Sequence, residues 1–179
     1  MIYVGCTWSG PKGILCVPEA IIVGHLCTYE GRRANTTKVS KIATWEPCKT
    51  PSEVRTFLGT AGLMRIFIRN YSSIARPLTQ LTCKGVDFEF GEAQVQAQEL
   101  LKQAILTSPA IHAIDYESEE PIFLSVDTSY IAIGYVLAQG IPGKPKSHYP
   151  SRFGSMLLNE RELKYSQPKL KLYGLFRSL

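Results

Sequence analysis

One carboxylate in the second half of the chain stands where metal ligands are often presented. Asp127 lies in the stretch FLSVDTSYIAIGYVLAQ, residues 123–139, in which large and small residues alternate after the aspartate. This period is typical of a strand and predicts two strands joined at Thr128-Ser129-Tyr130. An aspartate at the end of a strand either binds a cation or stabilises a turn. The stretch alone favours the turn interpretation.

Basic residues in the first half could contact phosphate groups. Arg65 and Arg69 are four residues apart, so on a helix they would share a face. Lys38, Lys41 and Arg55 lie near them in the sequence. Scattered cations of this kind either contact a nucleic-acid backbone or form a solvated face. The net charge of +5 and the pI near 9.0 permit an anionic partner without requiring one.

Histidine and cysteine spacing argues against a metal centre. His25 and Cys27 could be a ligand pair, but no second pair follows, so a partly buried histidine is the more common explanation. The five cysteines are widely spaced and never form a C-x-x-C pair. We therefore expect reduced thiols rather than a disulfide framework or a zinc site.

Two helices are predicted in the first 110 residues. Thr50-Pro51-Ser52-Glu53 forms a capping box with proline at the first helical position, so a helix begins there. Its apolar stripe comprises Val54, Phe57, Leu58 and Ala61, and Leu63, Ile66 and Phe67 extend it. A second helix is predicted from Glu92 to Ile105, with Ala97, Leu100, Leu101, Ala104 and Ile105 on its apolar side.

Shorter signals surround these helices. Residues 14–29 predict a hairpin broken at Pro18-Glu19, after which Glu30-Gly31 turns the chain into a polar connector. Residues 75–78 and Lys84-Gly85 predict changes of direction, and a domain boundary is expected near Cys83 to Gly85.

After Asp115 the pattern predicts a meander of three strands. These are residues 121–127, residues 131–139 and a strand around Phe153 to Leu158, with a loop from Gly140 to Pro145 between the last two. Ser166-Gln167-Pro168 then caps a helix that runs to Leu179, and Leu170, Tyr173 and Leu175 are among its apolar positions.

Composition places the chain among globular proteins. It has 179 residues, of which 45% are hydrophobic and 20% charged. No apolar run approaches the roughly 20 residues that span a bilayer, and the start lacks the order of a secretory signal. We therefore expect an intracellular protein, cytoplasmic or nuclear, with no membrane partner; the sequence predicts no oligomeric state.

Several runs in fixed order resemble the pol polyprotein of gypsy-type LTR retrotransposons. They are WEPCKTPSEVRTFLG (Trp45 to Gly59), FIRNYS (Phe67 to Ser72), PLTQLT (Pro77 to Thr82) and the strand around Asp127. The resemblance implies a mixed α+β chain. Residues 1–84 would be the end of a reverse transcriptase palm with its helical thumb and connection. Residues 85–179 would be a truncated ribonuclease H-like domain, comprising a three-strand meander and its first helix.

The resemblance implies RNA-directed DNA synthesis and degradation of RNA in RNA–DNA hybrids, both with Mg²⁺, but this chain departs from the family. It has no Y-x-D-D turn. By the family's motif Asp127 is the first acidic ligand of the ribonuclease, and Lys171 stands where K-L-E-L-Y is usual. Glu162, nine residues earlier, would fall on the opposite side of a continuous helix. The family's later acids would lie beyond residue 179.

We therefore expect a non-catalytic chain in which Asp127 is vestigial, no cofactor is bound, and Lys171 pairs with Asp127 in place of the ion. A nucleic-acid-binding or interaction module is an alternative; it would use Arg65, Arg69, Arg55 and Lys41 to hold an RNA–DNA hybrid or other nucleic acid weakly. A segment of a longer, active polyprotein is another. The surrounding reading frame would separate these.

Overall fold

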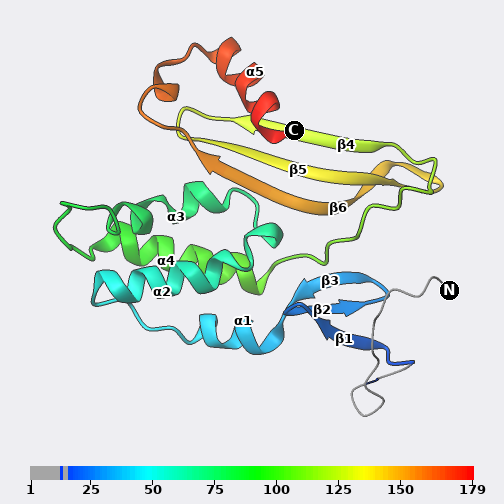
Figure 1. Ribbon diagram of the computed structural model, residues 1–179, viewed down its shortest axis with the longest axis horizontal. Helices are drawn as coiled ribbons and strands as arrows, with labels where there is room; N and C mark the ends of the chain where they lie inside the picture. Colours follow the sequence, from blue (N-terminus) through cyan, green and yellow to red (C-terminus); the bar gives the residue numbers. More distant parts are fainter. Residues whose placement is uncertain (1–12, 14–15) are drawn as a thin grey trace, which may run out of the picture.

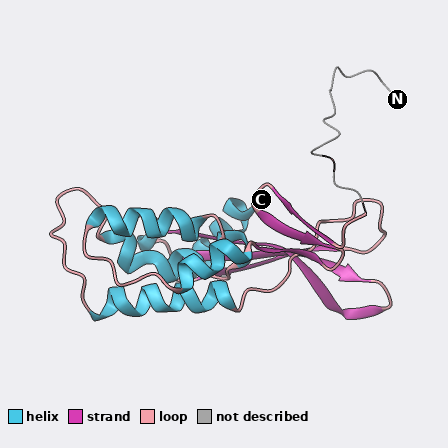
Figure 2. Ribbon diagram, turned by 90° about the horizontal axis from the view of Figure 1, so that it is seen from below, coloured by secondary structure: helices cyan, strands magenta, loops and turns pink. Residues whose placement is uncertain are grey.

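The computed structural model describes residue 13 and residues 16–179, and within them the chain forms two three-stranded antiparallel sheets and five α-helices (Figure 1). Helices α1 to α4 lie together on the β6 side of the larger sheet, and α5 lies on its β4 side. Figure 2 shows the helices gathered toward one end of the molecule, with strands of both sheets extending toward the other. None of the described helices combines the length and apolar content that a bilayer crossing requires.

The smaller sheet is a meander of four-residue strands. Its strands are β1 (Glu19–Ile22), β2 (His25–Thr28) and β3 (Gly31–Ala34). The predicted hairpin is present, but its turn is at Val23-Gly24 rather than at Pro18-Glu19. Both turn residues have positive φ, 49° and 79°, as tight two-residue hairpin turns require. The predicted polar connector is wrong, because Gly31 begins β3. Residues 14 and 15 of the predicted hairpin lie outside the described residues.

Side-chain caps begin the first two helices. Asn35 accepts a 2.9 Å bond from the Thr37 N–H to start α1 (Thr36–Ala43), a short helix that the sequence pattern did not predict. Thr50 accepts from the Glu53 N–H at 3.2 Å to start α2 (Pro51–Gly62), which confirms the predicted start. The Glu53 carboxylate accepts from the Lys49 N–H at 2.7 Å rather than from Thr50.

The segment after α2 corrects two predictions. A short 3₁₀ turn, η2 (Arg65–Phe67), ends before Ile68, whose φ of −111° and ψ of 118° are extended, so Arg65 and Arg69 do not share a helix face. The predicted change of direction at residues 75–78 falls inside α3 (Tyr71–Gln80). Pro77 removes one helical hydrogen bond. The helix nevertheless continues because it buries Tyr71, Ala75 and Leu78 in the core.

Helix α4 (Glu92–Leu106) confirms the second predicted helix. Leu100, predicted on the apolar side, is 57% exposed, whereas Gln98 is buried and donates to the Glu46 carbonyl at 2.8 Å. Helices α1 to α4 enclose one core, to which β6 adds Phe153. Its largest buried side chains are Ile42, Phe57, Met64, Phe67, Ile68, Leu78, Leu101, Ile105 and Ile111. A domain boundary near Cys83 to Gly85 stays a prediction.

The larger sheet confirms the predicted meander. It comprises β4 (Ile122–Thr128), β5 (Ala132–Ile141) and β6 (Lys144–Leu157) in that order. The predicted loop is shorter, because Gly143 adopts a φ of 73° and closes the hairpin, so β6 begins at Lys144 rather than near Phe153.

The last helix, α5 (Gln167–Ser178), packs on one face of this sheet through Leu170, which is fully buried and lies in one apolar cluster with Ile133 and Leu158. Pro168 lies in its first turn as predicted, although Ser166 makes no side-chain cap bond. Leu175, predicted as apolar packing, is 45% exposed.

Candidate active site and nucleic-acid interface

Asp127 lies in a strand rather than in a turn. It is a residue of β4, its cross-strand partner in β5 is Gly134, and Gly134 in turn pairs with Ser155 in β6. Cross-strand partners point to the same face of a sheet, so these three residues form one row, here called the Asp127 row.

The Asp127 row points away from α5. A Cβ on Gly174 of α5 would overlap the Thr128 hydroxyl and touch Val126, so these two residues of β4 face the helix. Because successive side chains of a strand alternate between faces, Asp127 points to the other face. Lys171, an exposed residue of α5, makes no ion pair with Asp127 among the ion pairs of the described residues. The expected contact between them is therefore not formed.

These residues do not fit a Mg²⁺ site. Magnesium is held through several oxygen ligands, and Asp127 brings a single exposed carboxylate. Across residue 13 and residues 16–179, no group of three or more histidine, cysteine, aspartate or glutamate side chains is placed to hold a metal ion.

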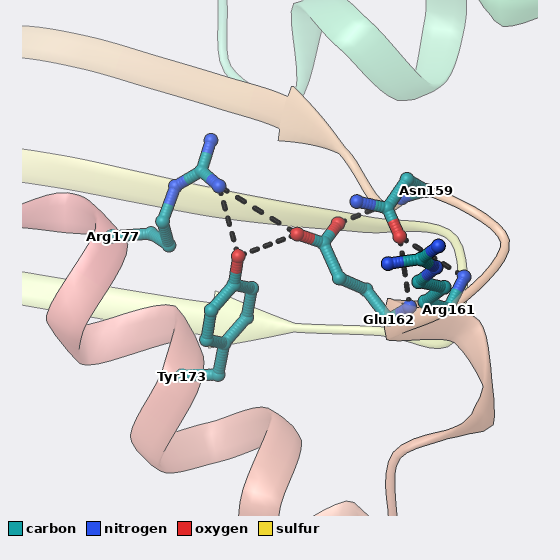
Figure 3. Close-up of polar contacts among 5 residues, drawn as sticks. All are labelled: Asn159, Arg161, Glu162, Tyr173 and Arg177. Atoms are coloured by element: carbon teal, nitrogen blue, oxygen red, sulfur yellow. Dashed lines mark hydrogen bonds and ion pairs between the residues drawn. The ribbon is translucent and has the colours of Figure 1, made fainter.

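Glu162, considered as a substitute acid, has another role (Figure 3). It lies in a separate 3₁₀ turn, η3 (Glu162–Lys164), and its buried carboxylate accepts from the Asn159 N–H at 2.7 Å and from the Tyr173 hydroxyl at 2.5 Å. The Arg177 guanidinium lies 3.6 Å from Glu162 and donates to the Tyr173 oxygen at 2.9 Å. We call this group the α5 clamp, because it joins the helix to the loop that precedes it.

The α5 clamp shifts two pKa values. The hydrogen bond from Tyr173 and then the one from the Asn159 N–H lower the pKa of Glu162. The same bond to Glu162, and then burial, raise the pKa of Tyr173. These contacts therefore favour the ionised form of Glu162, which positions a helix.

The four predicted nucleic-acid-binding cations have different surroundings. Arg65 donates to the Ser155 carbonyl at 2.6 Å and lies over the Tyr71 ring at 5.7 Å, so it holds the sheet. Arg55 donates to the Thr82 carbonyl at 3.3 Å. All four are exposed, but the side chains of Arg69 and of Lys41, the latter in the last turn of α1, make no hydrogen bond or ion pair with the other described residues. Arg69 also lines a shallow pocket with side chains from α4 and β6.

Sequence reasoning missed a set of polar contacts, here called the docking seam, between the helices and the sheet. The Ser72 N–H donates to the Ser155 hydroxyl at 2.8 Å, and the Ser72 hydroxyl donates to the Ser155 carbonyl at 2.9 Å. Asn70, in the left-handed region at φ 56°, ψ 30°, places its side chain where a Cβ on Gly134 would stand. With Arg65, these residues join η2 and α3 to the Asp127 row. The small residue at 134 was the one sequence signal of this close approach.

Comparison with known proteins is consistent with this architecture. Residues 90–179 match the family described as an RNase H-like domain found in reverse transcriptase. The retrovirus-related Pol polyprotein from transposon 297 of Drosophila melanogaster is 33% identical over 158 residues, which are 88% of this chain and 14% of that protein. The transposon Tf2-3 polyprotein of Schizosaccharomyces pombe is 28% identical over 157 residues, 88% of this chain and 12% of the relative. The chain thus spans about an eighth of the length of these curated relatives.

Two solved structures share the fold. The foamy viral protease-reverse transcriptase dRH in complex with double-stranded DNA has a TM-score of 0.76 at 20% identity, covering 89% of this chain and 27% of that one. The same viral protein in complex with an RNA/DNA hybrid has a TM-score of 0.75 at 21% identity, covering 90% and 21%. The resemblance to retrotransposon pol polyproteins is confirmed, and the chain belongs to the family of RNase H-like domains found in reverse transcriptase.

Proposed function

We propose that this segment of a retrotransposon reverse transcriptase contacts nucleic acid without cleaving it. In this proposal residues 1–84 are the end of the palm with the thumb and connection, and residues 85–179 are the ribonuclease H-like part. The observation that carries the proposal is what packs against the Asp127 row. Asn70 lies against Gly134 and Ser72 binds Ser155, where a metal site would need a second acidic side chain.

Lys171 also supports the lack of cleavage. Ribonuclease chemistry of this kind needs two positioned metal ions. A lysine 4 Å from Mg²⁺ would be repelled by about 8 kcal/mol at an effective dielectric of about 20. The family's motif carries an acid at this position, so Lys171 replaces an expected metal ligand with a side chain that would repel the ion.

Contact with nucleic acid is supported by charge and by the relatives. Arg69 and Lys41 are exposed and have no ion pair among the described residues, on a chain of net charge +5. The structures of similar fold hold double-stranded DNA or an RNA/DNA hybrid. We propose that binding is weak, indifferent to sequence and dependent on salt, because it rests on a few phosphate contacts.

A hybrid-cleavage assay tests the proposal. The chain and its Lys171→Glu form are incubated with a labelled RNA–DNA hybrid and Mg²⁺, with and without chelator. We expect no cleavage from either, since one exchanged residue does not supply the remaining ligands. Chelator-sensitive cleavage by the original chain that Asp127→Asn abolishes would overturn the non-catalytic assignment.

A second candidate is favoured by the length of the relatives, of which this chain spans 14% and 12%. In it, the chain is one segment of a longer, active polyprotein whose metal-binding acids are elsewhere. A reading frame that continues into Y-x-D-D upstream and into further acidic residues downstream would support this candidate. Stop codons that close the frame directly on both sides of this segment would contradict it.

A further inference from the structure

Two cationic side chains, Arg32 and Lys38, lie near His25 where the smaller sheet faces α1. In the register of β2 and β3, His25 pairs with Ala34 and Cys27 pairs with Arg32, so His25 and Arg32 point to the same face. The His25 ring stands edge-on to Phe67 at 5.4 Å, which identifies this face as the one toward the helices. Lys38 extends from α1 and brings its ammonium to 2.9 Å from the point where a Cβ on Gly24 would stand.

No carboxylate balances these charges within the described part of the chain. The ion pairs there join Arg33 to Glu30, Lys102 to Glu99, and Arg177 to Glu162. The stretches that the structure does not describe, residues 1–12 and 14–15, contain no aspartate or glutamate.

Two polar atoms of the cluster are also left unsatisfied. The Nε of Arg32 and the Nδ1 of His25 are buried without a hydrogen-bond partner among the described residues. Arg32, Lys38 and His25 are each half-buried. Polar and charged groups removed from water without a partner are costly, so this arrangement is stable only at a free-energy cost that an anion would offset.

We propose that His25, Arg32 and Lys38 form a binding site for a phosphate-class oxyanion, between the β1–β2 turn and α1. A guanidinium and an ammonium donate charge-assisted hydrogen bonds to phosphate oxygens. Gly24 leaves room for the ammonium because it has no side chain. Its ligands do not include Arg69 or Lys41, and it takes either a free phosphate or one phosphodiester of a nucleic acid.

The titration of His25 is consistent with this site. Burial, followed by the charges of Arg32 and then Lys38, lowers the pKa of His25. A bound oxyanion would act in the opposite direction and raise the pKa of His25, because it stabilises the imidazolium. Both cations that act on the ring are the proposed ligands themselves.

Thermal melts of the whole chain in increasing inorganic phosphate, against sodium chloride at equal ionic strength, test the site. We expect a saturable rise in Tm with phosphate and not with chloride. Lys38→Gln and Arg32→Gln should each weaken the apparent affinity by roughly tenfold or more, as expected on losing one charge-assisted hydrogen bond. Arg33→Gln is the matched control, because this neighbouring arginine is on the outer face of β3 and pairs with Glu30.

A second readout does not depend on how the variants fold. The pKa of His25, followed by NMR in the unmodified chain, should rise on adding phosphate and not on adding chloride. Equal effects of phosphate and chloride, or an equal loss of affinity in Arg33→Gln, would overturn the site. If a short oligonucleotide competes with phosphate, the site takes a phosphodiester. If phosphate binds and the oligonucleotide does not compete, the site takes a free oxyanion.

Discussion

The guanidinium of Arg65 donates a 2.6 Å hydrogen bond to the main-chain carbonyl of Ser155, ninety residues further along the chain. The Ser72 hydroxyl donates to the same carbonyl. The Ser155 carbonyl oxygen, in the edge strand β6, therefore accepts two hydrogen bonds from the helical part of the chain. An arginine that would otherwise be assigned to nucleic acid thus joins two parts of the protein, and this changes what its substitution should do.

Arg65→Ala should destabilise the protein. Loss of a hydrogen bond from a charged donor should lower the free energy of unfolding by about 1 to 2 kcal/mol, because Ser72 still serves the Ser155 carbonyl. Chemical denaturation measures the difference. Arg69→Ala is the control and should change the free energy by less than about 0.5 kcal/mol, since Arg69 is exposed and its side chain makes no hydrogen bond or ion pair with the other described residues. Equal effects of the two would show that the Arg65 contact has no energetic role.

Gly134→Ala should weaken the docking seam by steric overlap. The new methyl group would occupy the position of the Asn70 side-chain oxygen, so we expect a loss of about 1 to 3 kcal/mol in unfolding free energy. Asn70→Gly removes that side chain and also suits the left-handed backbone at this position.

The double variant Gly134→Ala/Asn70→Gly should therefore recover much of the lost stability, and a double-mutant cycle by denaturation measures the coupling. Gly140→Ala is the comparison, because its methyl would meet the end of a flexible glutamate, Glu120, at 2.8 Å. Additive effects of the Gly134 and Asn70 changes would contradict direct packing between them.

Local signals in the sequence predicted most of the regular elements. The box at Thr50 located the start of α2, and the alternation around Asp127 located β4 and β5, because both depend on residues close in the chain. Helix α3 was missed because Pro77 is a local signal to stop, whereas burial of Leu78 and its neighbours is a tertiary effect. The turn at Val23-Gly24 was missed because valine seldom adopts positive φ.

The candidate site was predictable only in part. The alternating pattern located Asp127 in a strand. It could not show that Asp127 points away from α5, because residues 123–139 do not determine on which face of the sheet a later helix packs. The docking seam joins Ser72 to Ser155 across 83 positions, and serines carry no pattern that predicts such a pair. The α5 clamp was hidden for the same reason, since Glu162 and Tyr173 belong to separate helical turns.

Binding of an RNA–DNA hybrid should depend on Arg69 and Lys41 rather than on Arg65. With about two phosphate contacts, the logarithm of the binding constant should fall with the logarithm of salt concentration with a slope of about −2. Arg69→Gln and Lys41→Gln should each reduce that slope by about one unit. Fluorescence anisotropy at several salt concentrations measures it, with Arg33→Gln as the control because that arginine pairs with Glu30. An unchanged slope in both variants would show that neither Arg69 nor Lys41 contacts a phosphate of the hybrid.

The α5 clamp should make stability depend on pH through Glu162. Because the folded protein lowers the pKa of Glu162, through Tyr173 and then the Asn159 N–H, the carboxylate contributes stability above the ordinary glutamate pKa of about 4.3. That contribution is lost as pH falls through the lower folded value. Thermal melts from pH 7 to pH 3 should therefore show Glu162→Gln with a lower Tm at neutral pH and a narrowing difference in acid. Exposed Glu160→Gln is the control. A difference that stays constant between pH 7 and pH 3 would contradict an ionised Glu162.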